Sequence, residues 1–222
     1  MGRGKPRKVT VASKVSLFVD PSAQRRLERA DAWLEGHEPS RPVLVLSGSR
    51  AAAMAMVRRR AERLGQTEDR ALFGTYAMTL GRLVSTLAIP ELARQGLTPA
   101  SRLSLIAVCA RIVHQLGAAG RLGRYQPIAH RPGLPAAFAR TIDELRMAEV
   151  APASLDYEQL GLRAVYMAYL DEIQHQGLAD RAIIYQTASR RARDMAVAAP
   201  PLGIPFLLLD VDIATRSYRM PR

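Results

Sequence analysis

Three stretches of this sequence carry side chains that could bind a phosphate or a metal ion. The apolar run Phe206–Leu209 ends in Asp210, so a strand here would deliver a carboxylate to its carboxyl end, where it could hold magnesium or simply cap a turn. A second apolar run, Val43–Leu46, leads into Ser47-Gly48-Ser49-Arg50. The third stretch, residues 74–80, reads Gly-Thr-Tyr-Ala-Met-Thr-Leu.

The sequence lacks the loop that tight nucleotide binding requires. Such a loop follows the first strand as G-x-x-x-x-G-K-[ST], because glycine amides cradle the phosphates and the lysine neutralises them. After the apolar run Val15–Val19 the chain instead reads Asp20-Pro21-Ser22-Ala23-Gln24-Arg25-Arg26, with neither glycine nor lysine. We therefore expect no catalytic residue, no nucleotide-binding residue, no cofactor and no metal site beyond the weak candidate Asp210.

The composition is that of a globular chain, and most of its positive net charge lies in the two terminal segments. The 222 residues are 48% hydrophobic, and no apolar run approaches the roughly 18–20 residues that cross a bilayer. Of the net charge of +12, residues 1–14 carry five and residues 216–222 carry three, which leaves +4 for residues 15–215. Arg58–Arg60 and Arg190–Arg193 are predicted to be solvated helix faces. The single cysteine, Cys109, fits a reducing cytoplasm, and its place on the apolar face of a predicted helix indicates an inert core thiol. No membrane partner is expected.

Hydrophobic periodicity predicts alternating strands and helices in the first part of the chain. Three strand–helix units follow one another, and this order is typical of an α/β fold with a parallel sheet. The expected strands are residues 15–19, 43–46 and 72–76, and the expected helices run to Gly36, from Arg50 to Leu64 with a stop at Gly65, and through Leu80, Leu83, Val84 and Leu87.

After residue 90 the pattern becomes helical for more than a hundred residues. The first predicted helix opens at Thr98-Pro99 and ends near Gly117, and the second covers residues 134–148. The third has an apolar stripe from Leu162 to Ile173 and ends at Gly177, and the last runs from a cap at Asp180 towards Val197. A strand returns at residues 206–211. We interpret this order as a basic tail (1–14), an α/β half (15–97), an all-helical insertion (98–202) and a returning strand with a tail (203–222). Because no helix follows to cover that last strand, the α/β domain is expected to be incomplete.

Two of the stretches resemble motifs of superfamily 1 helicases. Residues 43–53 are similar to a strand followed by T-N-K-A-A-x-E-M-x-x-R, with Ser49, Arg50, Ala51, Ala52 and Arg58 on the Asn, Lys, Ala, Ala and Arg positions, while Met54 and Ala55 replace Glu and Met. Residues 74–80 resemble the T-F-H-S-L segment, with Thr79-Leu80 on Ser-Leu or shifted by one residue. In those helicases both segments touch the backbone of single-stranded DNA. The resemblance implies DNA-binding roles for Ser49, Arg50, Thr79 and Arg82.

A narrower resemblance concerns the helical part. Residues 132–146 are similar to a stretch of bacterial AddB-like proteins of the PD-(D/E)XK nuclease family, and the likeness extends over roughly residues 15–215. In that family an N-terminal helicase-like domain has lost its ATPase residues, and a nuclease domain lies at the far C-terminus. The run ending in Asp210 then resembles a Walker B strand, with Val211 in place of the catalytic glutamate. The implied fold is a P-loop-NTPase-like, helicase-type core interrupted by the helical insertion.

The resemblance implies a function in DNA repair and recombination. We expect a non-catalytic, single-stranded-DNA-binding or scaffold portion of an AddB-type helicase–nuclease that acts on double-strand breaks beside an AddA-like helicase subunit. The chain holds no nuclease motif, so exonuclease or helicase activity would belong to a full-length relative. The alternatives are a protein-interaction module and a non-functional truncated fragment; an active ATPase is a third and weaker interpretation, which measured turnover would support.

Overall fold

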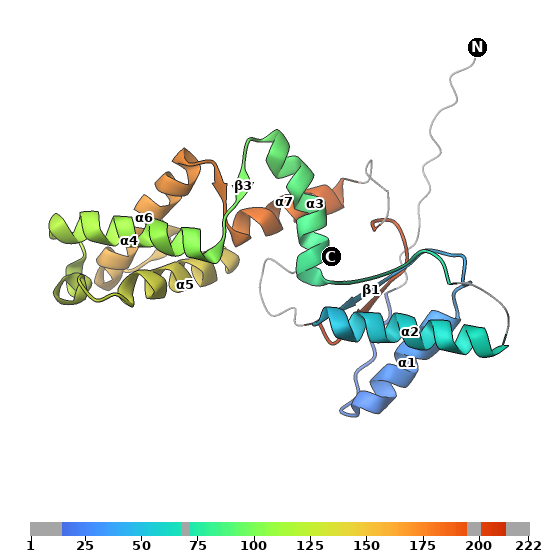
Figure 1. Cartoon of the computed structure of the whole chain (residues 1–222). Helices are drawn as coiled ribbons and strands as arrows, with labels where there is room; N and C mark the ends of the chain where they lie inside the picture. Colours follow the sequence, from blue (N-terminus) through green and yellow to red (C-terminus); the bar gives the residue numbers. More distant parts are fainter. Residues whose placement is uncertain (1–14, 68–71, 195–200, 212–222) are drawn as a thin grey trace, which may run out of the picture.

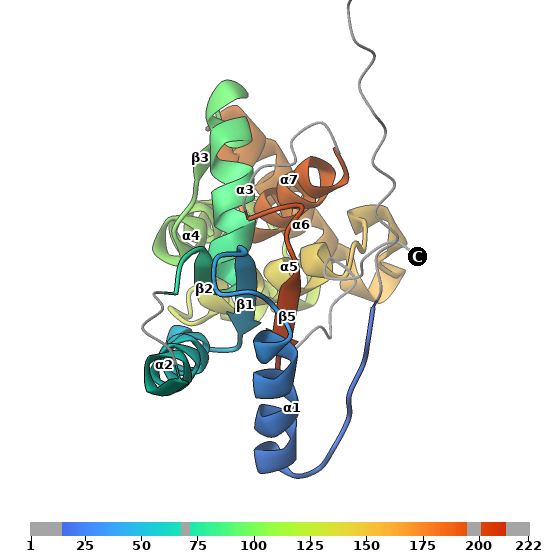
Figure 2. The same cartoon turned by 90° about the vertical axis from the view of Figure 1, so that its right-hand side faces the viewer.

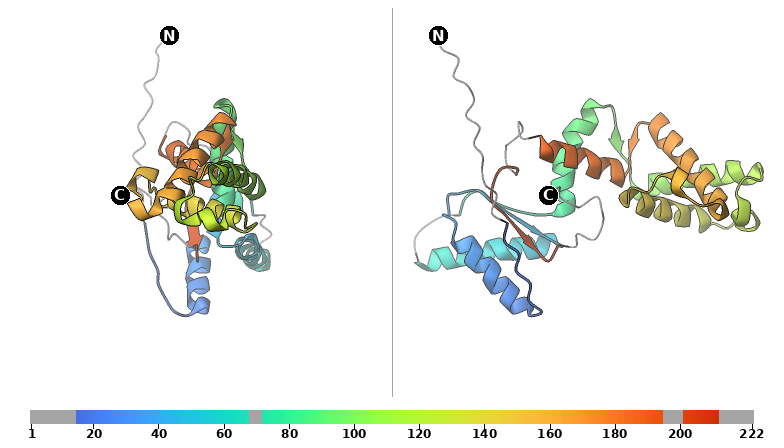
Figure 3. Two further views of the ribbon diagram at one scale, coloured as in Figure 1. Left: turned by 90° about the vertical axis from the view of Figure 1, so that its left-hand side faces the viewer. Right: turned by 180° about the vertical axis from the view of Figure 1, so that it is seen from behind.

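The computed structural model describes residues 15–67, 72–194 and 201–211 of the chain. Figure 1 shows a small sheet with two helices at one end of the molecule and a bundle of helices at the other. Helices α3 (Leu80–Arg94) and α7 (Arg181–Arg193) lie between these two parts, as the view from behind in Figure 3 also shows. The chain therefore places its α/β and helical portions side by side and joins them through a pair of helices.

The sheet consists of three parallel strands with β1 in the middle. Strand β1 (Val43–Ser47) pairs with β2 (Thr75–Thr79) on one side and with β5 (Phe206–Leu209) on the other; Figure 2 shows this order. All five residues of β1 are buried, as expected of a continuous apolar strand in a parallel sheet. Helix α2 (Arg50–Thr67) connects β1 to β2. The predicted α/β class with a parallel sheet is confirmed.

Two helices cover one face of this sheet. Helix α1 (Ala23–Glu35) and α2 pack their apolar sides against alternate strand residues, so one core contains Leu34 and Met56 together with Val43, Val45 and Leu209. Alternation along a strand sends every second side chain to the same face. Helix α2 continues to Thr67, past the stop predicted at Gly65.

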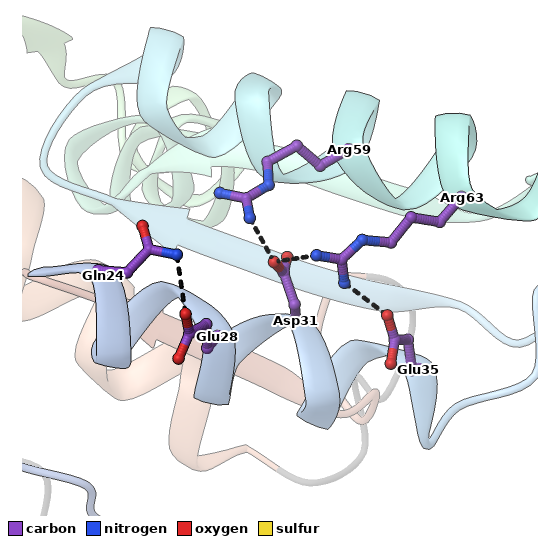
Figure 4. Close-up of polar contacts among 6 residues, drawn as sticks. All are labelled: Gln24, Glu28, Asp31, Glu35, Arg59 and Arg63. Atoms are coloured by element: carbon purple, nitrogen blue, oxygen red, sulfur yellow. Dashed lines mark hydrogen bonds and ion pairs between the residues drawn. The ribbon is translucent and has the colours of Figure 1, made fainter.

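A buried carboxylate joins α1 to α2 (Figure 4). Asp31, only 4% exposed, accepts hydrogen bonds from Arg59 at 2.7 Å and from Arg63 at 2.8 Å, and Arg63 also reaches Glu35 at 2.5 Å. Arg60 is buried as well: it donates to the backbone oxygens of residues 37 and 38, and burial lowers the pKa of its guanidinium. The prediction that Arg58–Arg60 form a solvated face is wrong for Arg59 and Arg60, since these arginines hold the helix in place.

The strand predicted at Val15–Val19 is wrong. These residues are irregular and exposed, with Val15 and Leu17 each 88% exposed and Val19 80% exposed. A β-prone sequence becomes a strand only when a neighbouring strand satisfies its backbone groups. In the described structure β5 has a partner on one side only, and residues 15–19 pair with neither edge of the sheet.

The third strand lies a little later than expected. Strand β2 begins at Thr75, after Gly74 in the left-handed region (φ +71°), and continues to Thr79, whereas the sequence placed it at 72–76. Strand β5 ends at Leu209 because Asp210 has φ +49°, which breaks the extended conformation predicted to reach Val211.

Helices α3 and α7 form the connection between the two parts. Helix α3 (Leu80–Arg94) packs on α7 (Arg181–Arg193) through Val84, Ala88 and Leu92 on one side and Ala188 on the other. Two short strands, β3 (Thr98–Pro99) and β4 (Leu178–Ala179), pair in parallel beside them. Thr98-Pro99 therefore does not open a helix as predicted. Residues 195–197, the expected end of α7, lie outside the described residues.

The helical bundle has its own apolar core. It contains α4 (Arg102–Ala118), α5 (Leu134–Met147) and α6 (Leu160–His175), with the short 3-10 helices η1 (Gly123–Ile128), η2 (Pro152–Ser154) and η3 (Tyr157–Gln159) in the connections. Ser101 caps α4 by accepting a hydrogen bond from the Ser104 amide at 3.0 Å. The core includes Ile112, Phe138, Ile142 and Val165.

A buried ion pair fixes the start of α7 to the bundle. Asp180 is 2% exposed and caps α7 by accepting from the Ile183 amide at 3.0 Å, as predicted. Its carboxylate also pairs with Arg146 of α5 and accepts from the hydroxyl of Tyr169 at 3.1 Å. Burial, together with the nearby carboxylate, raises the pKa of Tyr169. This group of polar side chains holds α5, α6 and α7 in one arrangement.

Candidate nucleic-acid interface

The residues singled out from the sequence lie at the carboxyl edge of the sheet. Ser47, the last residue of β1, is in register with Thr79 at the end of β2 and with Leu209 at the end of β5. The loops that leave these three strands therefore start from one edge. In open α/β sheets ligands bind outside this edge, where helices on either side of a central strand diverge.

Ser49 and Thr79 both act as helix N-caps. The Ser49 hydroxyl accepts a hydrogen bond from the Ala52 amide at 3.1 Å, and the Thr79 hydroxyl accepts from the Arg82 amide at 3.2 Å. A capping hydroxyl uses its oxygen as the acceptor and keeps its own hydrogen for another partner. Each side chain can therefore cap its helix and still donate to a phosphate oxygen.

Arg50 and Arg82 stand directly behind these caps. Arg50 is the first residue of α2 and Arg82 is the third residue of α3, and both side chains are exposed. Within the described ranges no carboxylate is within ion-pair distance of either guanidinium, and neither first turn contains an acidic residue. The two arginines are thus available for an anionic ligand at the sheet edge.

The helix ends add further donors for an anion. The first backbone amides of a helix have no partner within the helix, and the helix dipole places partial positive charge there. In α3 one of these positions is Gly81, and a Cβ built there would have no atom within 4 Å, so the backbone is open to approach. Gly81 was not singled out from the sequence, although a glycine two residues after a capping threonine suits close backbone contact.

Asp210 reaches the same edge but is already paired. Arg26 of α1 donates to its two carboxylate oxygens at 3.0 and 3.3 Å, and Arg26 also donates to the backbone oxygen of Asp20 at 2.6 Å. A Cβ on Gly48 would lie 3.4 Å from the Asp210 backbone oxygen, so the loop after β1 packs against the end of β5. The Arg26 pairing was not evident from the sequence, because the partners are 184 residues apart.

The segment that replaces a phosphate loop has a structural function instead. Asp20 accepts a hydrogen bond from the Ser22 amide at 2.8 Å, and Ser22 caps α1 by accepting from the Arg25 amide at 3.4 Å. Because residues 15–19 form no strand, this segment does not present a strand–loop–helix cradle. In the described part of the chain, no group of three or more His, Cys, Asp or Glu side chains is placed to hold a metal ion.

Cys109 and the described histidines take no part in this edge. Cys109 is fully buried in the bundle core, and burial raises the pKa of its thiol to about 12, so it remains a neutral, inert side chain at physiological pH. The prediction of a core thiol is confirmed. The edge presents hydroxyls, backbone amides and guanidinium groups, together with the Asp210 carboxylate that is paired with Arg26. Hydroxyls, amides and guanidinium groups are donors to phosphate oxygens in protein–DNA complexes.

Comparison with known proteins adds no assignment: no family model matches the chain, and no curated protein matches it significantly. None of the helices in the described ranges has the length and apolar character needed to cross a membrane.

Proposed function

We propose that this chain is a non-catalytic, helicase-like portion of an AddB-type helicase–nuclease, and that it contacts the backbone of single-stranded DNA through the carboxyl edge of its sheet. The observation that carries the proposal is the placement of two capping hydroxyls and two exposed arginines, Ser49, Arg50, Thr79 and Arg82, at that one edge. Hydroxyls, arginines and helix N-termini are the groups that contact phosphates in protein–DNA complexes.

The finer fold assignment belongs to the same proposal. Three parallel strands with α1 and α2 on one face are compatible with part of a P-loop-NTPase-like core that lacks its phosphate loop. In a complete helicase–nuclease such a part would hold single-stranded DNA while ATP hydrolysis and cleavage take place elsewhere. The proposed setting is double-strand-break repair and recombination in the cytoplasm, beside an AddA-like helicase subunit.

Binding of a fluorescein-labelled dT30 oligonucleotide, followed by anisotropy between 50 and 200 mM KCl, tests the DNA contact. Each phosphate contact to a single strand contributes roughly 0.7 to the slope of log K against log salt. The double variant Arg50→Gln/Arg82→Gln should therefore lower the slope by about 1.4 and weaken binding at low salt. Both side chains are exposed, so the fold should be retained.

The matched control is Arg29→Gln/Arg41→Gln, which removes the same charge from two exposed positions, one on α1 and one in the loop that precedes β1. We expect this control to bind nearly as the wild-type chain does. Equal loss in both variants, or no binding of dT30 by the wild-type chain at low salt, would refute the proposed DNA contact.

The second face of the sheet favours a second candidate, a protein-interaction module. Tyr76, Phe206 and Leu208 point away from α1 and α2 and remain 39%, 45% and 39% exposed. Parallel sheets normally have both faces covered. Co-purification with an AddA-like subunit in the absence of DNA, lost in the variant Phe206→Ser/Leu208→Ser, would favour this candidate, whereas unchanged co-purification of that variant would reject this face as the contact.

A further inference from the structure

A long acid-free stretch lies in the helical bundle. Between Glu91 and Asp143 there are seven arginines and no aspartate or glutamate. Two of the seven are neutralised locally: Arg94 pairs with Glu91, and Arg111 pairs with Glu172 of α6. Three others, Arg121, Arg124 and Arg131, belong to the connection between α4 and α5, residues 119–133, which we call the arginine loop.

The arginine loop is held firmly against the bundle core. Leu122 is fully buried, and the ring of Tyr125 packs edge-on against Phe138 with ring centres 5.0 Å apart. Gln126 donates to the backbone oxygen of Gly117 at 2.7 Å and accepts from the Leu122 amide at 3.3 Å. Leu122 and Tyr125 therefore face inwards and fix the backbone from which the arginines project.

The three arginines themselves are exposed and largely uncompensated. Arg124 lies over the ring of Tyr125, 5.1 Å from its centre, and donates to the Tyr125 hydroxyl at 2.9 Å. The negative charge of Glu158, in η3, interacts electrostatically with the Arg124 guanidinium. Within the described ranges neither Arg121 nor Arg131 has a carboxylate within ion-pair distance. Because the backbone of the loop is already fixed, binding of an anion has to order only the arginine side chains.

We infer that the arginine loop is a second contact surface for the phosphate backbone of single-stranded DNA. It lies at the end of α4 that is remote from β3 and α3 (Figure 1), so it is separate from the sheet edge. The choice of single-stranded DNA as the polyanion rests on the proposed function. The positive charge of the arginine loop is a feature of the structure and does not depend on that proposal.

An anionic membrane fits this surface less well than DNA does. The cations are all arginines, whose planar groups match phosphate oxygens in pairs. The large apolar side chain that the arginine loop exposes is Ile128, whose exposed fraction is 42%. One such residue provides little apolar area to insert into a bilayer. Helix α4, with 17 residues, is about 25 Å long. A DNA strand that uses both surfaces must therefore extend over many nucleotides, so the probe should be long.

The test uses the full chain and labelled dT30, with anisotropy measured from 50 to 200 mM KCl. The triple variant Arg121→Gln/Arg124→Gln/Arg131→Gln should lower the salt slope by about 2 and weaken low-salt binding at least several-fold. The charge-retaining variant Arg121→Lys/Arg124→Lys/Arg131→Lys should keep most of the slope. The control Arg29→Gln/Arg41→Gln/Arg102→Gln removes the same charge from exposed positions elsewhere and should bind nearly as the wild-type chain does.

The sheet-edge variant Arg50→Gln/Arg82→Gln, measured in parallel, separates the two proposals. If only the loop variant loses dT30 binding, the arginine loop is supported as a DNA contact and the sheet edge is rejected as one. If only the sheet-edge variant loses dT30 binding, the inference is overturned. Equal loss in the loop variant and the triple control overturns it too, because the effect would then be one of total charge. Binding to phosphatidylcholine/phosphatidylserine vesicles is measured as well. If the triple loop variant bound dT30 as the wild-type chain does but no longer bound these vesicles, the loop would contact a membrane and the inference would be overturned. Thermal melting by circular dichroism confirms that every variant is folded.

Discussion

Arg26 and Asp210 form a two-point ion pair that joins the first turn of α1 to the end of β5, with nitrogen–oxygen distances of 3.0 and 3.3 Å across 184 residues of sequence. The carboxylate that the sequence offered as a magnesium ligand is thus held by a guanidinium. Asp210 is also in the left-handed backbone region, with φ +49°, at the point where the strand ends. We interpret the residue as a structural connection between helix and sheet.

We expect Asp210→Asn to lower the free energy of unfolding by less than about 1 kcal/mol, because the Asp210 side chain is 58% exposed and exposed ion pairs contribute little. Adding 10 mM MgCl2 should shift the Tm of the wild-type chain and of the variant equally. Differential scanning fluorimetry with and without magnesium measures both. A magnesium-dependent rise in Tm confined to the wild-type chain would restore the metal-ligand interpretation.

Asp31 gives a sharper stability prediction, because it is buried between two arginines (Figure 4). Asp31→Asn leaves an amide facing two guanidinium groups and should lower the free energy of unfolding by roughly 1.5–3 kcal/mol, the range for hydrogen bonds to charged groups. Glu28→Gln on the same helix is the control: Glu28 is exposed and accepts only from Gln24 at 2.8 Å within the described residues. The control should change stability by less than about 0.5 kcal/mol in urea unfolding. Similar losses in both variants would show that Asp31 adds no specific contact.

Gly161 permits the close approach of α6 to the arginine loop. A Cβ at this position would lie 2.1 Å from the Leu122 backbone oxygen, so one of the two backbones must shift. Gly161→Ala should lower the free energy of unfolding by about 1–3 kcal/mol or more. Gly65→Ala in α2 has open space around the new methyl group and should raise it by roughly 0.5–1 kcal/mol. A Gly161→Ala variant as stable as Gly65→Ala would contradict the described packing.

Cys109 makes stability depend on alkaline pH. Burial raises the pKa of its thiol to about 12, whereas the thiol of an unfolded chain titrates near 8.5. The unfolded state therefore releases its proton first, and stability that is complete below about pH 8.5 is lost as the pH rises towards 12. The loss approaches about 1.4 kcal/mol per pH unit for this one group. Cys109→Ala should flatten the slope of unfolding free energy between pH 8.5 and 10.

The wild-type chain and Cys109→Ala are compared by the slope of unfolding free energy against pH, because removing the thiol from the core also lowers the stability of the variant at every pH. Tyr169→Phe is the companion variant, because burial raises the pKa of Tyr169 too, and its unfolded-state pKa lies near 10. It should leave the slope below pH 9 unchanged and reduce it above pH 10. If Cys109→Ala kept the wild-type slope, the alkaline loss would have to arise from other groups.

The apolar strands and capped helices could be predicted from the sequence because their signals are local. Val43–Ser47 is apolar throughout, and a strand buried on both faces requires this. Asp180 stands one residue before α7, and a side chain that caps a helix acts within three residues of itself. The serine and threonine at the sheet edge follow the same rule, so their positions at helix starts could be expected.

Pairing between segments that are distant in the chain could not be predicted from the sequence. Val15–Val19 has the composition of a strand and forms none, whereas Thr98-Pro99, which suggested a helix start, pairs with Leu178-Ala179. A strand depends on hydrogen bonds to another segment, and composition does not name that segment. The charges of Arg59 and Arg60 likewise suggested a solvated face, until the fold placed Asp31 and two backbone oxygens beside them.

The sequence by itself determined the parallel α/β class, the helical bundle, the buried thiol and the absence of a phosphate-loop motif, since each follows from residue types and short spacings. Only the tertiary structure decided that Arg26 holds Asp210, that Arg50 and Arg82 share one open edge, and that Arg121, Arg124 and Arg131 project from a loop fixed to the bundle core. The physical reason is that ion pairing and exposure depend on which distant groups packing brings within a few ångströms, and this information is not carried by local sequence.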